Sequence, residues 1–361
     1  GLDGMPANHR THSHGQGYAD INFIVPEFVD HLSYFKGPFN TSYGDLSTAG
    51  GAEYELYNRL PEGILSLTYG SDDYARFLFG DSWDLGAGAL TFGIEYTHEN
   101  GPWLQKNDYN RYNLFARYHQ GDEDNYFNIT GLAHTGKWNS SDQIPLRAVQ
   151  DGSLDRFGSL DDSTGGDTSR YSLSTRWQRS DENSTTHLDA WLGTYDLELF
   201  SNFTYFLNDP VRGDQFEQNE SRIFAGANLW HQWNYQLSGM ESKTTLGFQT
   251  RHDFINDIGL YLTQDRERYR TIRQDDVNVS SYSLYLDHET RINDWFRAGL
   301  GLRSDLFQFD VESDLAANSG NETDSIFSPK LNLAFGPWNE TEFYLNAGLG
   351  FHSNDARGTT L

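Results

Sequence analysis

The sequence has no cysteine, only 2 methionines and 9 prolines, and no apolar run long enough for a membrane helix. Without cysteine, a disulfide scaffold and a Cys-ligated zinc site are excluded. A membrane helix needs about 20 apolar residues in succession, so none is predicted. A basic surplus is also missing, because the formal net charge is -26. We therefore expect no nucleic-acid partner, since phosphate contacts need a basic surface.

Signatures of catalytic sites are missing as well. The sequence has no Gly-x-Ser-x-Gly elbow, no phosphate-binding loop and no His-Glu-x-x-His helix. Its many Asp and Glu residues lie in polar connecting segments, where a solvated role is the default. We therefore predict that the protein is not an enzyme and has no cofactor.

What the sequence does contain is aromatic residues and glycine. Aromatics make up 15% of the 361 residues, and 35 glycines accompany them. The mean hydropathy of -0.68 is typical of a soluble protein. A membrane β-barrel has the same average, because only every second residue of each strand faces lipid. The aromatic and glycine content therefore favours a membrane barrel, although a large soluble β-protein could show the same composition.

Period-two alternation between turns predicts an all-β protein. Many of the predicted strands are long enough to cross a bilayer at a tilt. About thirteen strands are expected, at residues 63–70, 74–83, 89–98, 109–120, 126–138, 170–179, 187–206, 222–236, 242–252, 279–291, 295–311, 326–336 and 342–352.

The connections between these strands alternate in length, as they do in outer-membrane barrels. A soluble sandwich has no reason to keep such an alternation. Long polar connections are expected at residues 139–169, 207–221, 253–278 and 312–325, and short ones at 121–125, 181–185, 293–294 and 337–341.

The two faces of the predicted strands differ in polarity. One face of residues 295–305 is apolar, and the other carries Arg297, Arg303 and Asp305. In a buried sandwich core each of these charges would need a partner or cost several kcal/mol. A wet or polar lumen accepts them. We therefore expect an apolar outer face that includes Phe92, Leu300, Leu302, Phe343, Leu345 and Leu349.

The first 60 residues carry three landmarks in order. They are Asp-Gly-Met-Pro at residues 3–6, Ile-Val-Pro-Glu at 24–27, and Lys-Gly-Pro at 36–38 followed by Tyr-Gly at 43–44 and Gly-Gly at 50–51. The glycines and prolines force turns and allow close backbone approach. Together the landmarks resemble the closing part of the plug domain of TonB-dependent outer-membrane receptors.

This resemblance implies a fold and a function. The fold class is all-β: residues 1–60 form the C-terminal portion of a plug, and residues 61–361 form a transmembrane antiparallel up-and-down β-barrel, about 13 of 22 strands. The function is energised uptake of a scarce substrate, such as a ferric siderophore or other metal chelate, across the outer membrane of a Gram-negative bacterium. The partners are the TonB-ExbB-ExbD complex, the substrate and outer-membrane lipid. A passive porin and a soluble secreted carbohydrate-binding β-protein are the alternatives.

Neither terminus is typical of a complete receptor. Gly1 is not a translational start, and the last residues do not form a terminal aromatic strand. We therefore expect a fragment, with the TonB-contacting segment before Gly1 and about nine strands after Leu361.

A polar loop at residues 9–20 is the candidate substrate site, because the resemblance places it at the apex of the plug. Spaced imidazoles could ligate a transition metal or donate hydrogen bonds to an anionic chelate. They could equally be plain loop structure. In the receptor family a basic residue precedes Gly-Pro, and we expect Lys36 to be buried there between plug and barrel and to pair with carboxylates. The candidate substrate-binding residues are His9, Arg10, His12, His14, Gln16 and Tyr18.

Overall fold

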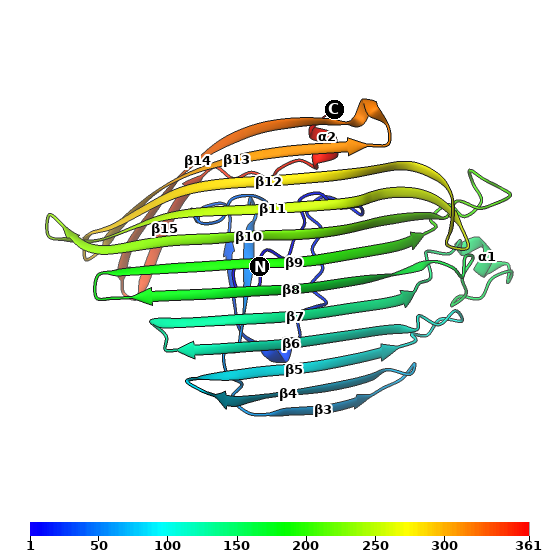
Figure 1. Cartoon of the computed structure of the whole chain (residues 1–361), viewed down its shortest axis with the longest axis horizontal. Helices are drawn as coiled ribbons and strands as arrows, with labels where there is room; N and C mark the ends of the chain where they lie inside the picture. The colour runs from blue at the N-terminus through cyan, green and yellow to red at the C-terminus, as the bar shows by residue number, and fades with distance from the viewer. Residues whose placement is uncertain (361) are drawn as a thin grey trace.

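The computed structural model describes residues 1–360, which form a two-stranded and a thirteen-stranded antiparallel sheet. In the larger sheet every strand is hydrogen-bonded to its neighbours in sequence, so the chain runs through it as successive hairpins (Figure 1). The strands are β3 (Ile64–Tyr69), β4 (Ala75–Leu85), β5 (Gly88–Glu99), β6 (Tyr109–Gly121), β7 (Asn125–Asn139), β8 (Gly165–Ser180), β9 (Ser184–Ser201), β10 (Phe216–Leu237), β11 (Met240–Gln264), β12 (Glu267–Asn293), β13 (Phe296–Ser313), β14 (Gly320–Trp338) and β15 (Thr341–Gly348).

The thirteen expected strands are confirmed in number and order, but the prediction of one long connection is wrong. Residues 253–278 are not a loop, because β11 and β12 continue to a tight turn at Asp265 and Arg266, which both have positive φ. A bulge hides this extension from the sequence. The register shifts between Ile255 and Ile258, so both side chains are buried although they are three residues apart.

Two other boundaries also differ. The connection between β13 and β14 is shorter than expected, since only residues 314–319 separate the strands. At the end of the chain, β15 stops at Gly348 instead of residue 352. Residues 349–360 leave the sheet and include α2 (Ala356–Thr359), which contacts β12 and β13.

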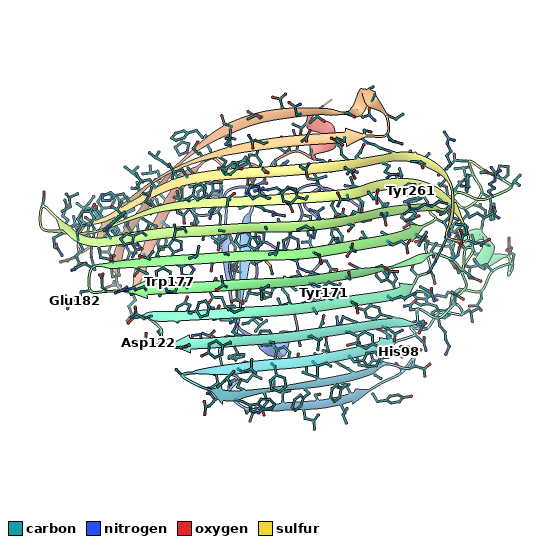
Figure 2. The ribbon with its side chains drawn as sticks, in the orientation of Figure 1. His98, Asp122, Tyr171, Trp177, Glu182 and Tyr261 are labelled. Atoms are coloured by element: carbon teal, nitrogen blue, oxygen red, sulfur yellow. The ribbon has the colours of Figure 1, made fainter. Side chains whose placement is uncertain are left out.

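The two ends of the sheet are unlike. Asp122 and Glu182 mark the short-turn end, and His98 and Tyr261 lie toward the opposite, long-loop end (Figure 2). At the long-loop end the connections are joined by hydrogen bonds. Arg266, at the β11–β12 turn, donates to the Ser163 carbonyl at 2.6 Å, and Asn202 donates to Asp161 at 2.8 Å. We call these joined connections, residues 100–108, 140–164, 202–215 and 265–266, the rim.

The expected division of the faces is confirmed. Leu300 and Phe343 are each 60% exposed on the outer face, whereas Arg303 and Asp305 are buried on the inner face. Exposed tryptophans gather at the short-turn end of the outer face, where Trp177 is labelled in Figure 2. Among residues 1–360, no helix has the length and apolar character needed to cross a membrane.

The first 60 residues, here called the inner segment, lie across the inner face of the sheet (Figure 1). The inner segment contains η1 (Pro26–Phe28) and a hairpin of β1 (Val29–Lys36) and β2 (Gly50–Leu56). Phe28 anchors it, and its ring packs with Phe115 of β6 at 5.3 Å. The ring fills the space above Gly93, where an added Cβ would lie 1.9 Å from it. Glycine in β5 therefore makes room for the inner segment.

An arginine placed on the outer face tests whether that face lies in lipid. If the outer face lies in hydrocarbon, as the barrel resemblance implies, Leu300→Arg is expected to lower the free energy of unfolding in lipid vesicles by ~2 to 4 kcal/mol. Ala317→Arg, in the connection between β13 and β14, is the control and should change it little. Equal, small losses in both variants would show that the Leu300 face is not in lipid.

Candidate functional site

A continuous row of polar side chains crosses the inner face at one level. The strand register pairs the members of this row directly, from β5 to β10. Asn113 donates to Glu95 at 2.7 Å and meets the Nδ1 atom of His134, also at 2.7 Å. The row consists of Glu95, Asn113, His134, Arg170, Tyr195 and Arg222, and it forms the wall against which residues 9–23 pack.

Cationic side chains of the sheet donate to backbone carbonyls of the inner segment. Arg251 donates to the Asn8 carbonyl at 2.9 Å, and Arg117 donates to the Leu56 carbonyl at 2.6 Å. Arg303 donates to the Ser42 carbonyl at 3.0 Å. The inner segment has little regular structure, so these donors satisfy acceptors that a sheet ladder would otherwise pair.

Two of these arginines are neutralised by carboxylates two residues away on their own strands, whereas Arg117 pairs with Asp3 of the inner segment. Arg303 and Asp305 form an ion pair of 2.8 Å, and Arg251 and Asp253 form another at 2.8 Å. Residues i and i+2 of a strand face the same side, so the spacing directs both charges inward. This Arg-x-Asp pattern is visible in the sequence and is a signal for the wall residues that our sequence analysis did not extend beyond Arg303 and Asp305.

The charge of Arg170 is stabilised in a different way. It is 3% exposed and has no carboxylate within 4 Å in the described part of the chain. Its guanidinium instead lies 4.5 Å from the ring of Phe23, in the inner segment, and 4.6 Å from the ring of Phe224, in β10. Two aromatic faces stabilise the cation. Arg170 therefore joins the inner segment to the wall.

The first half of the polar loop is buried, although the resemblance made its residues candidates for substrate contact. His9 is 2% exposed and His12 is fully buried. The His9 ring packs on Tyr195 at 4.6 Å, and His12 contacts the Tyr195 hydroxyl at 3.2 Å. Arg10 pairs with Asp45 at 2.7 Å. These three side chains hold the loop against the wall.

The second half of the loop is open. His14 and Gln16 are exposed and Tyr18 is half-buried, with its ring stacked on His12 at 4.2 Å. His14 Nδ1 meets the side-chain carbonyl of Gln218 at 2.9 Å. Gln218 in turn donates to the Ser13 carbonyl at 2.8 Å, so β10 fixes the loop from below.

His9 and His12 are neutral in the folded protein. Burial, together with the nearby Arg222 guanidinium, lowers the pKa of His12 to about 2. Burial likewise lowers the pKa of His9 well below its usual range. The 3.7 Å contact between His12 and Glu220 is thus not an ion pair. Because these two imidazoles stay neutral near pH 6, their protonation cannot release a bound ligand at that pH.

Nor do these imidazoles converge on a metal. Within residues 1–360 no three His, Asp or Glu side chains are grouped in a way that could hold an ion. His9 and His12 stack on one another at 5.5 Å instead. Direct ligation, one of the alternatives for this loop, has no geometric support.

The expectation for Lys36 is wrong. Its side chain is exposed, and it forms no ion pair within the described residues. The wall supplies the buried cation in place of the inner segment: Lys330 of β14 donates to the Pro38 carbonyl, two residues beyond Lys36. The sequence of the inner segment alone does not indicate that the buried cation comes from β14 and not from Lys36.

A second site lies on the inner face at the long-loop end of β5, β6 and β7. It is a cleft of about 300 Å³, here called the outer cleft. Three aromatic side chains and one carboxylate line it. Trp103 and Trp138 both line this cleft. Its lining residues are Glu99, Trp103, Asn107, Tyr109, Trp138, Asn139, Ser140 and Ser141.

Comparison with known proteins identifies the fold. No protein-family model and no curated protein matches the sequence. Among solved structures, the unliganded ferric citrate transporter FecA matches at a TM-score of 0.81 and 12% identity, over 99% of this chain and 55% of FecA. The chain has the fold of TonB-dependent outer-membrane receptors.

Other receptors of this fold give the same result. The open form of the ferric-catecholate import receptor Fiu from E. coli K12 matches at a TM-score of 0.71 and 12% identity, over 90% of this chain and 60% of Fiu. The copper transporter OprC matches at 0.69 and 15%, over 96% of this chain and 54% of OprC. The chain thus spans little more than half the length of these receptors. The fold class expected from the sequence, an antiparallel up-and-down barrel sheet, is confirmed.

The buried state of His12 predicts a pH dependence of stability. Between pH 7 and 5 the unfolded chain takes up a proton at this position and the folded protein does not, so stability falls as the pH falls. The loss is about 2 kcal/mol for one such histidine. The His12→Asn variant should lose about that much less over the same interval, measured as the free energy of unfolding at both pH values. The same loss in both proteins would contradict the neutral, buried imidazole.

Proposed function

We propose that the protein is a TonB-dependent outer-membrane receptor that imports a scarce substrate, such as a ferric siderophore or other metal chelate. In this proposal residues 1–60 are the C-terminal portion of the plug and residues 61–361 are barrel wall. The single observation that carries it is the inner segment, which lies against the inner face and is held there by side chains of β6, β10, β11, β13 and β14.

The two alternatives explain less of the molecule. A passive porin needs an open lumen and has no use for a structured segment across its inner face. A soluble carbohydrate-binding β-protein would bury the apolar face on which Leu300 and Phe343 are exposed. We therefore assign the protein to the outer membrane of a Gram-negative bacterium.

The inner segment is suited to displacement by a pulling partner. Much of its contact with the wall consists of hydrogen bonds and ion pairs, such as Arg303 with the Ser42 carbonyl. Water can replace these partners at modest net cost per bond. We propose that the TonB-ExbB-ExbD complex supplies the force and that the loosened segment opens the path for substrate.

In the polar loop, substrate contact is assigned to the open half. His14, Gln16 and Tyr18 are accessible, whereas His9, Arg10 and His12 position the loop from beneath. The exposed imidazole and amide can donate hydrogen bonds to an anionic chelate.

Uptake measurements test this function. Cells that produce the receptor should accumulate iron-55 from at least one ferric siderophore of a panel, and only when TonB is active. His14→Ala combined with Gln16→Ala should weaken binding of that siderophore about tenfold, which corresponds to one or two lost hydrogen bonds.

The control for this pair is Ser33→Ala combined with Thr48→Ala, which changes exposed positions elsewhere in the inner segment. The control should bind and import normally at equal receptor levels. Import that continues without TonB would support a passive channel. Unchanged affinity in the His14 and Gln16 variant would leave that loop as connecting structure.

A further inference from the structure

The outer cleft is built from one row of inner-face side chains. Glu99 of β5 pairs in register with Tyr109 of β6, and the same register, which pairs Asn110 with Lys137, brings Tyr109 beside Trp138 of β7. These three residues lie on the same face as Glu95, Asn113 and His134, nearer the long-loop end. Trp103 joins them from the β5–β6 connection. The cleft therefore lies on the inner face of the sheet, which is the lumen side in the proposed function.

The aromatic faces of the outer cleft carry no cation of the chain itself. Elsewhere in this protein arginines lie over aromatic rings, such as Arg268 over Tyr261 at 3.8 Å. No Arg or Lys within residues 1–360 is placed in this way over Trp103, Tyr109 or Trp138. The rings are available to a ligand.

The carboxylate of the outer cleft is also free. Glu99 is exposed and forms no ion pair in the described chain. The two cations nearest to it along these strands are already neutralised, since Lys106 pairs with Asp73 at 3.3 Å and Arg111 pairs with Glu95 at 3.1 Å. The charge of Glu99 therefore remains available inside an aromatic site.

The lining of the cleft is held in place before any ligand arrives. Trp103 packs on Phe157 of the rim, with 6.1 Å between ring centres, and the next residue donates its backbone N–H to the Phe157 carbonyl at 3.0 Å. Asn139 donates to the Asn107 carbonyl at 2.6 Å. A site that is already ordered loses little entropy on binding.

We propose that the outer cleft binds an organic cation, an ammonium or quaternary ammonium group of the imported substrate. Glu99 supplies the opposite charge, and Trp103, Tyr109 and Trp138 supply aromatic faces that attract a cation. A volume of about 300 Å³ is at the lower limit for ligand pockets, so the cleft takes a head group and not a whole chelate. This inference rests on the proposed function for its substrate path, but its ligand chemistry follows from the cleft alone.

A matched pair of probes tests the charge requirement directly. Choline and its neutral isostere 3,3-dimethylbutan-1-ol have nearly the same shape, and their binding to the purified protein in detergent can be measured by calorimetry. Choline should bind, the neutral isostere should bind at least tenfold more weakly, and added salt should weaken choline binding. Equal binding of the two probes, or no choline binding by folded protein, would overturn the proposal.

Variants test the residues. Glu99→Gln keeps the size of the side chain and should weaken choline binding about tenfold, and Trp138→Leu should weaken it further. The controls are Glu312→Gln, an exposed carboxylate on β13, and Trp295→Leu at the short-turn end, and both should bind choline normally. Glu99→Gln with unchanged choline affinity would refute the role of the carboxylate. Preferential binding of glucose over choline would identify a neutral sugar site instead.

This experiment is separable from the test of the proposed function. Calorimetry in detergent needs neither TonB nor transport, so choline can bind even if uptake proves passive. Conversely, TonB-dependent uptake with no choline binding would leave the receptor function intact and remove only the cation site.

Discussion

The structure depends on the pairing of backbone carbonyls of the inner segment with cationic donors from the wall. A segment with so little regular structure leaves many carbonyls without ladder partners, and the inner face of the sheet supplies arginines to meet them. Each buried arginine then requires its own compensation. Asp305, Asp253 and Glu220 provide it from positions two residues away on the same strand. The wall is thus polar because the carbonyls of the inner segment require hydrogen-bond donors.

Arg170 shows that a buried arginine can be stabilised without a carboxylate. Between Phe23 and Phe224 its charge is met by aromatic faces that also pack as apolar surface. This arrangement ties the inner segment to the wall without a carboxylate partner. The inner segment is therefore held by four kinds of contact: apolar packing at Phe28, cation–π stacking at Arg170, ion pairs such as Arg117 with Asp3, and hydrogen bonds elsewhere.

Most of the fold could be predicted from the sequence, because strand alternation and face polarity are local properties. Thirteen strands and the outward position of Leu300 follow from period two alone. The extension of β11 could not be predicted in this way, since the bulge before Ile258 breaks the period. The candidate site was harder. That His12 is buried and His14 is open depends on Tyr195 and Gln218, some two hundred residues away in the chain, and no local pattern records such distant partners.

The hydrogen bonds that join the connections of the rim limit how the sequence of each connection can change. Arg266 alone donates to Ser163, Thr164 and Asn139, so a change in the β7–β8 connection alters partners in the β11–β12 turn. Here a single loop cannot be exchanged without loss of its neighbours' hydrogen bonds. Substitutions should therefore be tolerated best in residues 314–319, outside the rim, while the rim itself changes only as a block.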